Sequence, residues 1–202
     1  MVHRPDFETF CTLAADHTMV PVYRRLLSDT LTPVSAFMRM EPGSWSFLFE
    51  SVHGGEKVGR YSFFGGSPFF KMFAFDRQVT VEDDGQTKTY HADDPLAELD
   101  KLLAEYRAPQ VPGLPRFVGG AVGYAGYDAV RYFEHLPNAP TDDRKLPDMA
   151  FGLYDQMVVF DHISKVILVV VMVRVDSADL AGCYERGCQR VDAIADQLAA
   201  GT

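Results

Sequence analysis

The sequence predicts an α+β fold built largely from antiparallel β-sheets. Segments in which apolar and polar residues alternate outnumber the segments with helical spacing, and short turns join several of them directly. The chain has 202 residues, 47% of them hydrophobic, which is enough to bury a substantial core. Such a length suits one large domain or two small ones. We find no internal repeat and no low-complexity linker.

A small set of segments has the apolar spacing or the capping residues of helices. They run from Pro5 to His17, from Thr32 as N-cap, from Asp94 as the opening residue, and from Ser177 as the cap of a long C-terminal helix. In the second of them Pro33 occupies the first helical position, where its missing N–H costs nothing. We expect its apolar face to consist of Val34, Phe37 and Met38.

The first predicted strand is the segment "MVPVYRRLL", in which Pro21 biases Val20 away from helical dihedral angles. A second begins at Ser44, where Trp45, Phe47 and Phe49 alternate with smaller residues. Because two glycines follow at positions 54 and 55, we expect a turn there and a returning strand after it.

Further strands are expected around a hairpin turn at Asp84–Gly85. The glycine-rich segment "RFVGGAVGYAGYDAVRYFE" predicts a tightly packed strand that leads into a short helix near Asp128. The segments "MAFGLYDQMVVFDH" and "KVILVVVMVRV" are predicted to be two long buried strands, joined by a turn from Asp161 to Ser164.

Charge and composition exclude several classes of function. The formal net charge is −9 and the pI is near 5.0, which argues against nucleic acid or an anionic membrane as the main partner. The longest apolar run, Val166 to Val173, is too short to cross a bilayer, and the first residues lack the apolar segment of a signal peptide. Because the three cysteines form no disulfide-like pattern, we expect reduced thiols and a cytoplasmic protein.

Motifs for metal binding or nucleophilic catalysis are absent from the sequence. The six histidines are scattered, without the spacing of a metal site. No GxSxG sequence, P-loop or GxGxxG sequence is present. We therefore expect neither a metal nor a catalytic residue in this chain, and we interpret its glycine-rich stretches as packing features.

Glu50 is the most conspicuous candidate for a binding residue, because it ends an apolar strand and is followed by Ser51. A buried carboxylate needs a cation or several hydrogen-bond donors. If the turn centres on Gly55, Glu50 falls opposite Arg60 and a cross-strand ion pair satisfies both. The alternative is that Glu50 accepts from the ammonium group of an amino-acid ligand, to which Ser51 adds a hydroxyl.

Several segments resemble one enzyme family over nearly the whole chain and in the same order. "FLFES", from Phe47 to Ser51, resembles the LLES motif of anthranilate synthase component I. "VHGGEKVGRYSFFG", "VPVYRRLLSDTLTPVSAF", "RFVGGAVGYAGYDAVRYFE" and "LPDMAFGLYDQMVVFDH" are similar to the N-terminal region of the same chorismate-utilising family. The chain departs from the motif at Phe49, where leucine is usual, and we expect that ring to face the core.

The resemblance implies that residues 1–202 are the N-terminal regulatory domain, with antiparallel sheets packed as a sandwich and flanking helices. Family members are about two and a half times longer, and their C-terminal catalytic domain binds chorismate and Mg²⁺. The N-terminal region of the family contributes the feedback site for L-tryptophan. The residues carried over to this ligand are Glu50, Ser51, Pro21, Val22, Tyr23 and Lys57. Pro21 to Tyr23 would supply backbone or wall contacts, and Arg60 would pair with Glu50 in the empty site.

The intact enzyme of the family converts chorismate and ammonia to anthranilate and pyruvate, in tryptophan biosynthesis. Its partners would be L-tryptophan, its own catalytic domain, and a glutamine amidotransferase, component II, that delivers the ammonia. This chain alone is expected to be inactive. Two alternatives stay open: the N-terminal region of aminodeoxychorismate synthase component I in the folate pathway, and a stand-alone amino-acid-binding module.

Overall fold

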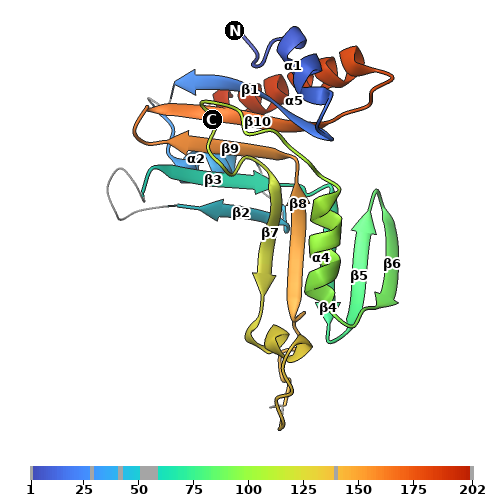
Figure 1. The fold of residues 1–202 in the computed structure, drawn as a ribbon. Helices are drawn as coiled ribbons and strands as arrows, with labels where there is room; N and C mark the ends of the chain where they lie inside the picture. The colour runs from blue at the N-terminus through green and yellow to red at the C-terminus, as the bar shows by residue number, and fades with distance from the viewer. Residues whose placement is uncertain (1, 28–29, 41–42, 51–58, 139–140, 201–202) are drawn as a thin grey trace. The chain divides into compact units, whose positions relative to one another are not determined.

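The computed structural model describes residues 2–27, 30–40, 43–50, 59–138 and 141–200. They form two compact units. The first unit comprises Met1–Ser67, Tyr106–Gly120 and Tyr154–Thr202, and the second comprises Pro68–Glu105 and Ala121–Leu153. Each unit contains a five-stranded sheet and at least one helix (Figure 1).

The sheet of the first unit, sheet A, has its strands in an order far from that of the sequence. From one edge to the other it contains β1 (Met19–Leu27), β10 (Val166–Arg174), β9 (Gln156–Asp161), β3 (Tyr61–Gly66) and β2 (Ser46–Phe49). Every neighbouring pair is antiparallel. The central strands β10 and β9 are buried almost throughout, as expected for their continuous apolar runs.

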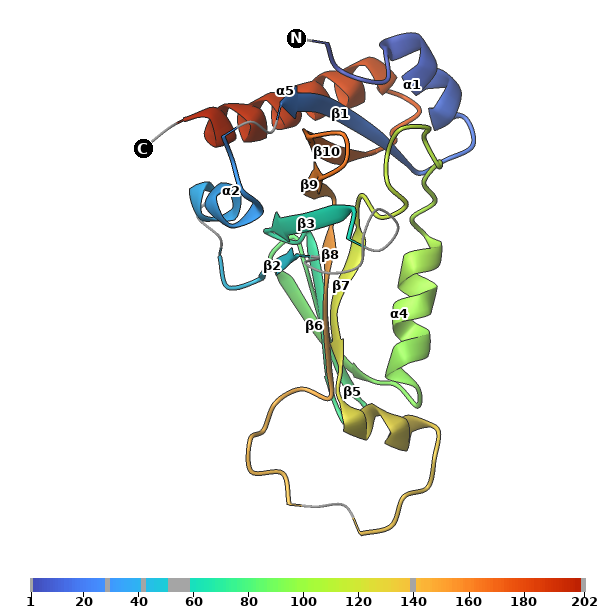
Figure 2. The same ribbon diagram turned by 90° about the vertical axis from the view of Figure 1, so that its left-hand side faces the viewer.

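The helices α1 (Phe7–Ala14), α2 (Pro33–Arg39) and α5 (Leu180–Ala199) cover one face of sheet A (Figure 2). Alternate residues of the strands point into this core, among them Val22 on β1 and Phe64 on β3. A Cβ at Gly187 of α5 would lie 2.5 Å from a methyl of Val173 and 3.3 Å from one of Val22, so the glycine permits the close approach of helix to sheet. Burial of this face supplies the main hydrophobic stabilisation of the unit.

Residues 106–120 lie against the opposite face of sheet A. The ring of Phe117 packs edge-on against Phe63 with 5.9 Å between the ring centroids. A Cβ at Gly119 would lie 2.8 Å from the side chain of Met172 and 3.1 Å from the carbonyl oxygen of Tyr154. Gly119, in the glycine-rich segment at the end of this region, therefore permits close packing, as the sequence indicates.

The second unit contains sheet B, helix α4 and the short 3₁₀ helix η1. Strand β4 pairs antiparallel with both β5 and β8, and β5 pairs antiparallel with β6. The elements are β4 (Phe70–Phe75), β5 (Gln78–Asp83), β6 (Gln86–His91), α4 (Pro95–Ala104), β7 (Gly120–Ala125), η1 (Tyr127–Tyr132) and β8 (Met149–Tyr154). The order across sheet B is β6-β5-β4-β8-β7.

The structure confirms the α+β class with two antiparallel sheets and flanking helices. It confirms the hairpin at Asp84–Gly85, where φ is 45° and 76°, as a type I′ turn requires. The predicted turn at positions 54 and 55 lies outside the described residues. Packing of the two sheets as a sandwich stays a prediction.

Several local predictions are wrong in instructive ways. The segment "MAFGLYDQMVVFDH" is two strands, β8 and β9, which belong to different sheets and are separated at Asp155. Asp179, not Ser177, caps α5, because its carboxylate accepts from the backbone N–H of Gly182. The first helix is shorter than predicted and begins at Phe7 after its N-cap, Asp6.

The capping of α2 is confirmed, since Thr32 and Ser35 form a reciprocal capping box and Pro33 opens the helix. Its predicted apolar face is wrong in part. Met38 is 65% exposed and Val34 is 48% exposed, whereas Ala36 is fully buried and Phe37 packs against the core. A helix of two turns buries only a narrow stripe of side chains, and the spacing of its apolar residues did not show where that stripe lies.

Candidate functional site

Polar side chains gather at one end of sheet A, where β2 ends, β3 begins and β9 ends side by side. They are Glu50, Arg60, Ser62, Asp161 and His162, and we call this group the charged end. The sequence pointed to the first two only. The others come from β9 and its turn, about a hundred residues further along the chain, and from the interior of β3.

Asp161 is a buried carboxylate whose hydrogen bonds are all made within the protein. Arg60 donates to it through two nitrogens, Nη2 to Oδ2 at 2.7 Å and Nε to Oδ1 at 3.2 Å. The backbone N–H groups of Ile163 and Ser164 donate to Oδ1 at 3.1 Å each, and the Ser164 hydroxyl donates to Oδ2 at 2.9 Å. Burial alone would raise the pKa of Asp161, but these bonds outweigh it and lower the pKa to about 2.

The expected ion pair between Glu50 and Arg60 is wrong. In the β2–β3 register Phe49 lies opposite Phe63, so continuing it places Glu50 opposite Ser62 and two residues away from Arg60. Arg60 is already held by Asp161 of the neighbouring strand. Glu50 is exposed and forms no ion pair with any residue that the structure describes. Among the described residues, no cation therefore neutralises its carboxylate at this end of the sheet.

Ser62 and His162 form the remaining polar contact of the charged end. The Ser62 hydroxyl lies 2.8 Å from His162 Nε2. Ser62 is 1% exposed, so this pair is shielded from solvent and is unsuited to attack a substrate. The His162 ring gives the buried Ser62 hydroxyl a hydrogen-bond partner on the helix-covered side of the sheet.

Aromatic rings line the other face of sheet A beside the charged end. The centroid distances are 5.2 Å for Phe47–Phe49 and 5.8 Å for Tyr61–Phe63, and the Arg60 guanidinium lies 4.9 Å from the centre of the Tyr61 ring. Phe49 is 51% exposed. The expectation that Phe49 faces the core is therefore wrong, because alternation along β2 turns it away from the helices.

Pro21, Val22 and Tyr23 are not brought next to Glu50. They belong to β1, at the edge of sheet A opposite to β2. Three strands separate the two edges, which corresponds to about 19 Å at about 4.8 Å per step. The Val22 side chain also points into the helical core. The other two carried-over residues, Ser51 and Lys57, lie outside the described residues.

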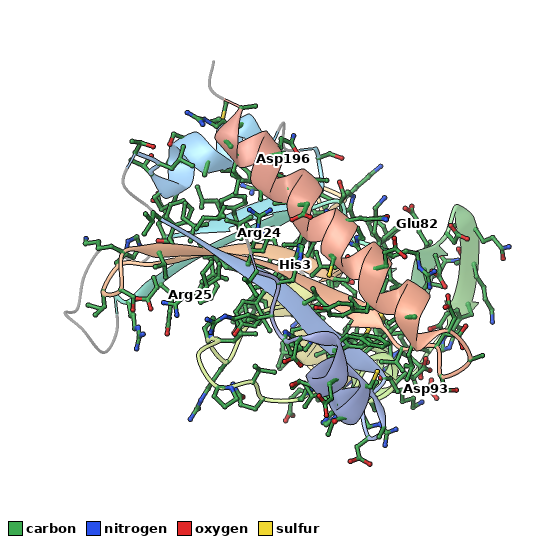
Figure 3. The ribbon with its side chains drawn as sticks, turned by 90° about the horizontal axis from the view of Figure 1, so that it is seen from above. His3, Arg24, Arg25, Glu82, Asp93 and Asp196 are labelled. Carbon is green, nitrogen blue, oxygen red and sulfur yellow. The ribbon has the colours of Figure 1, made fainter. Side chains whose placement is uncertain are left out.

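A second polar cluster lies under α5 and joins three distant segments. Asp192 Oδ1 lies 2.5 Å from Arg24 Nη1 and 2.9 Å from His3 Nε2, and Figure 3 shows His3 and Arg24 close together beside the helix. Burial alone would raise the pKa of Asp192, but the bonds from Arg24 and His3 lower it. Since Arg24 is 7% exposed, the cluster fastens the N-terminal segment to β1 and α5.

The described residues do not provide a metal site. Nowhere among them do three or more His, Cys, Asp or Glu side chains form a group able to hold an ion. In the part of the chain that the structure describes, no helix has the length and apolar character needed to cross a membrane.

Comparisons with known proteins agree with the resemblance seen in the sequence. The family model described as chorismate binding enzyme matches residues 54–200. The chain is 34% identical over 190 residues to an anthranilate synthase component 1 of Acetivibrio thermocellus, covering 94% of this chain and 38% of that protein. It is 40% identical over 195 residues to an anthranilate synthase component 1 of Pseudomonas aeruginosa, covering 95% of this chain and 39% of that protein.

A solved structure supports the fold. The crystal structure of anthranilate synthase component I from Streptococcus pneumoniae matches with a TM-score of 0.55 and 26% sequence identity. The match covers 89% of this chain and 37% of the other. The chain thus spans about two fifths of the length of these relatives.

Proposed function

The chain belongs to the family of chorismate binding enzymes, and from this premise we propose that it is the N-terminal, L-tryptophan-sensing part of an anthranilate synthase component I. The names of its relatives support the enzyme, and the charged end supports the ligand. As the relatives are much longer than this chain, the activity belongs to the intact enzyme.

The observation that carries the tryptophan proposal is the available carboxylate of Glu50. Every acceptor of Asp161 is occupied by donors, whereas Glu50 has no cation among the described residues and follows directly on exposed Phe49. An amino acid offers the ammonium group that Glu50 lacks, and an indole suits the aromatic surface beside it. Ser51 would add a hydroxyl, and Lys57 would be a further residue of the ligand site.

The wider enzyme would convert chorismate and ammonia to anthranilate and pyruvate in the cytoplasm. Component II, a glutamine amidotransferase, would supply the ammonia. Mg²⁺ and the catalytic residues would belong to the part of the relatives that this chain does not cover. Tryptophan would inhibit by favouring an inactive arrangement, which requires different affinities for the two states.

Calorimetry with L-tryptophan tests the proposed site. We expect weak binding to this chain, since the relatives contain further segments, and no detectable binding to Glu50→Ala. Glu134→Ala, an exposed glutamate of the second unit, is the matched control and should bind as the unchanged chain does. Equal affinity of the unchanged chain and Glu50→Ala would remove Glu50 from the site.

An activity assay tests the proposal that this chain alone has no synthase activity. With chorismate, Mg²⁺ and ammonium, we expect this chain to produce no anthranilate fluorescence, because it covers only about two fifths of its relatives and its described residues include no group of three or more metal-ligating side chains. Appearance of anthranilate would contradict the proposal. The full-length anthranilate synthase of a relative serves as the positive control.

The second candidate is the corresponding part of aminodeoxychorismate synthase. The cited relatives are all named as anthranilate synthases, which favours the first candidate. Complementation separates the two: the parent gene should rescue a tryptophan auxotroph and not a folate auxotroph.

A further inference from the structure

A cleft lies in the first unit between the beginning of α5 and the end of β10, two elements that pack against each other (Figure 1). Its volume of about 320 Å³ is within the range of sites for small molecules. Three arginines line it, Arg174, Arg186 and Arg190, together with two aspartates, Asp155 and Asp176. Because positive side chains outnumber negative ones here, in a chain whose net charge is −9, we call it the arginine cleft.

Packing holds the α5 wall of the cleft in place. Arg186 and Arg190 are one helical turn apart, so both side chains start from the side of α5 that borders the cleft. Between them, Gly187 lies so close to β10 that a Cβ there would be 2.5 Å from a methyl of Val173. Because helix and strand already touch at this point, the two arginines start from fixed positions.

Arg190 belongs to the wall of the cleft through a bidentate ion pair. Its Nη1 atom donates to Asp155 Oδ2 at 2.9 Å, and its Nη2 atom donates to Asp155 Oδ1 at 2.7 Å. The Asp155 side chain is only 13% exposed, so separating the pair would leave a part-buried carboxylate without its cation. We therefore expect this pair to stay closed, with its two charges offsetting each other.

Arg186, in contrast, is held by weak contacts at the surface. Its Nη1 atom lies 3.2 Å from Asp179 Oδ2, and the two side chains are 61% and 51% exposed. Its Nη2 atom lies 3.4 Å from the sulfur of Cys183, which is a weak acceptor. An exposed ion pair of this kind contributes little to stability, so the oxyanion of a ligand can replace Asp179 at low cost.

Arg174 adds a second positive charge from the opposite wall. It is the last residue of β10, and its exposed guanidinium lies 5.5 Å from the centre of the Tyr106 ring. Contact with the face of a ring orients a guanidinium without cancelling its charge. Asp176 turns one carboxylate oxygen towards its own chain, where it accepts from the Ala178 N–H at 2.9 Å. The charges of Arg174 and Arg186 therefore outweigh that of Asp176.

We propose that the arginine cleft binds a small organic molecule that carries a carboxylate or phosphate group. The oxyanion accepts charge-assisted hydrogen bonds from Arg186, whose planar guanidinium suits both groups, and Arg174 adds its charge from the other wall. The apolar part of the molecule lies on Val173 and Val175, which also line the cleft. The site consists of residues of the first unit and does not include Glu50, so it is independent of the proposed tryptophan site.

Succinate and glycerol 3-phosphate are suitable probes, because they present the two kinds of oxyanion on a short chain. In an NMR titration at constant ionic strength, the backbone amide signal of Gly187 should shift with the probe, because Gly187 lines the cleft. Gly123, on β7 in the second unit, is the internal control and should not shift. Succinamide has the length of succinate without its charge and should not bind. The tighter of the two probes identifies the oxyanion.

Substitution of single arginines tests which side chains bind the probe. Arg186→Gln and Arg174→Gln each remove a positive charge from the lining, and each should weaken the binding of the tighter probe by about tenfold or more. Arg25→Gln is the matched control, because Arg25 is exposed and pairs with Leu168, near the opposite end of β10 from Arg174. Figure 3 shows Arg25 on its strand. Urea unfolding of each variant verifies that it is folded.

Three results would overturn the proposal. The first is the absence of a Gly187 shift with either probe at millimolar concentration. The second is an equal shift with succinamide, or an equal shift of Gly123, which indicates that no oxyanion is recognised at the cleft. The third is that the folded Arg186→Gln and Arg174→Gln variants both bind the tighter probe as strongly as Arg25→Gln does.

Discussion

The two ends of sheet A differ in how they treat polar groups. At the charged end, a buried carboxylate receives bonds from a guanidinium, two backbone N–H groups and a hydroxyl. At the opposite end, β3 and β9 separate beyond the pair Phe64–Val158, and a small cavity lies there beside the apolar side chains of Phe37 and Met40 and the amide of Gln156. Ionic hydrogen bonds thus satisfy the polar groups at one end of the sheet, whereas the described residues around the cavity at the other end are apolar or uncharged.

Two carboxylates within the charged end, those of Asp161 and Glu50, also differ in their surroundings. Asp161 is 6% exposed and Glu50 is exposed, although they lie on neighbouring parts of the same sheet end. A saturated buried carboxylate contributes to stability, whereas an exposed carboxylate without a cation contributes little and can accept a ligand. Substitutions of these two carboxylates should therefore affect different properties.

Asp161→Ala should have the largest effect on stability. It leaves Arg60 without its acceptor, and it removes the acceptor of the turn N–H groups of Ile163 and Ser164. We expect a loss of about 3 kcal/mol in the free energy of unfolding, measured with urea. Glu50→Ala is the control and should change it by less than about 0.5 kcal/mol. Similar losses for both variants would remove the distinction between the two carboxylates.

Lowering the pH should remove the contribution of the Asp161 carboxylate to the free energy of unfolding. The pKa of Asp161 is about 2 in the folded chain, below the value of about 3.9 expected when unfolded. Its contribution is therefore complete above pH about 4 and is lost as the pH falls towards 2, with a total of about 2 kcal/mol. Urea unfolding at pH 7 and near pH 2.5 should show a loss of stability that is larger in the unchanged chain than in Asp161→Asn by about this amount, because Asp192 and the other carboxylates lose their contributions in both proteins.

The adjacent glycines of β3 should respond differently at the cavity end. Gly66→Val should change the free energy of unfolding by at most about 1 kcal/mol, because the new side chain enters open space and valine suits a strand. In Gly65→Val the Cβ would lie 2.9 Å from the Phe47 ring and 3.2 Å from the Gln156 carbonyl oxygen, so a clearly larger loss is expected. Equal losses would mean that the space beside Gly66 is already filled.

The sequence predicted the local elements of this fold better than it predicted which elements pack or pair with one another. The capping box at Thr32 and the Asp84–Gly85 hairpin depend on residues close in the chain, and both are confirmed. The partner of Arg60 is about a hundred residues away, and no local pattern indicates it. One apolar run divides at Asp155 into two strands that belong to different sheets, and the spacing of its residues does not indicate this division.

For the candidate site, the sequence indicated Glu50 by its place at the end of an apolar strand, and the family resemblance added the remaining residues. Glu50 is exposed and not buried as expected, and its expected pair with Arg60 depended on a turn centred on Gly55. A register longer by two residues moves Arg60 away from Glu50 and towards β9. Loop length sets register, and sequence alone does not determine loop length.

Phe49→Leu, which restores the residue usual in the family, should have the smallest effect. The ring is 51% exposed, so the change removes little buried surface and mainly the contact with Phe47 at 5.2 Å. We expect a loss of about 0.5 kcal/mol in the free energy of unfolding. In the calorimetric assay, tryptophan affinity should fall if the exposed ring contacts the indole, and the urea measurement on the same variant excludes unfolding as the cause. A loss above about 2 kcal/mol would instead show that Phe49 is part of the core.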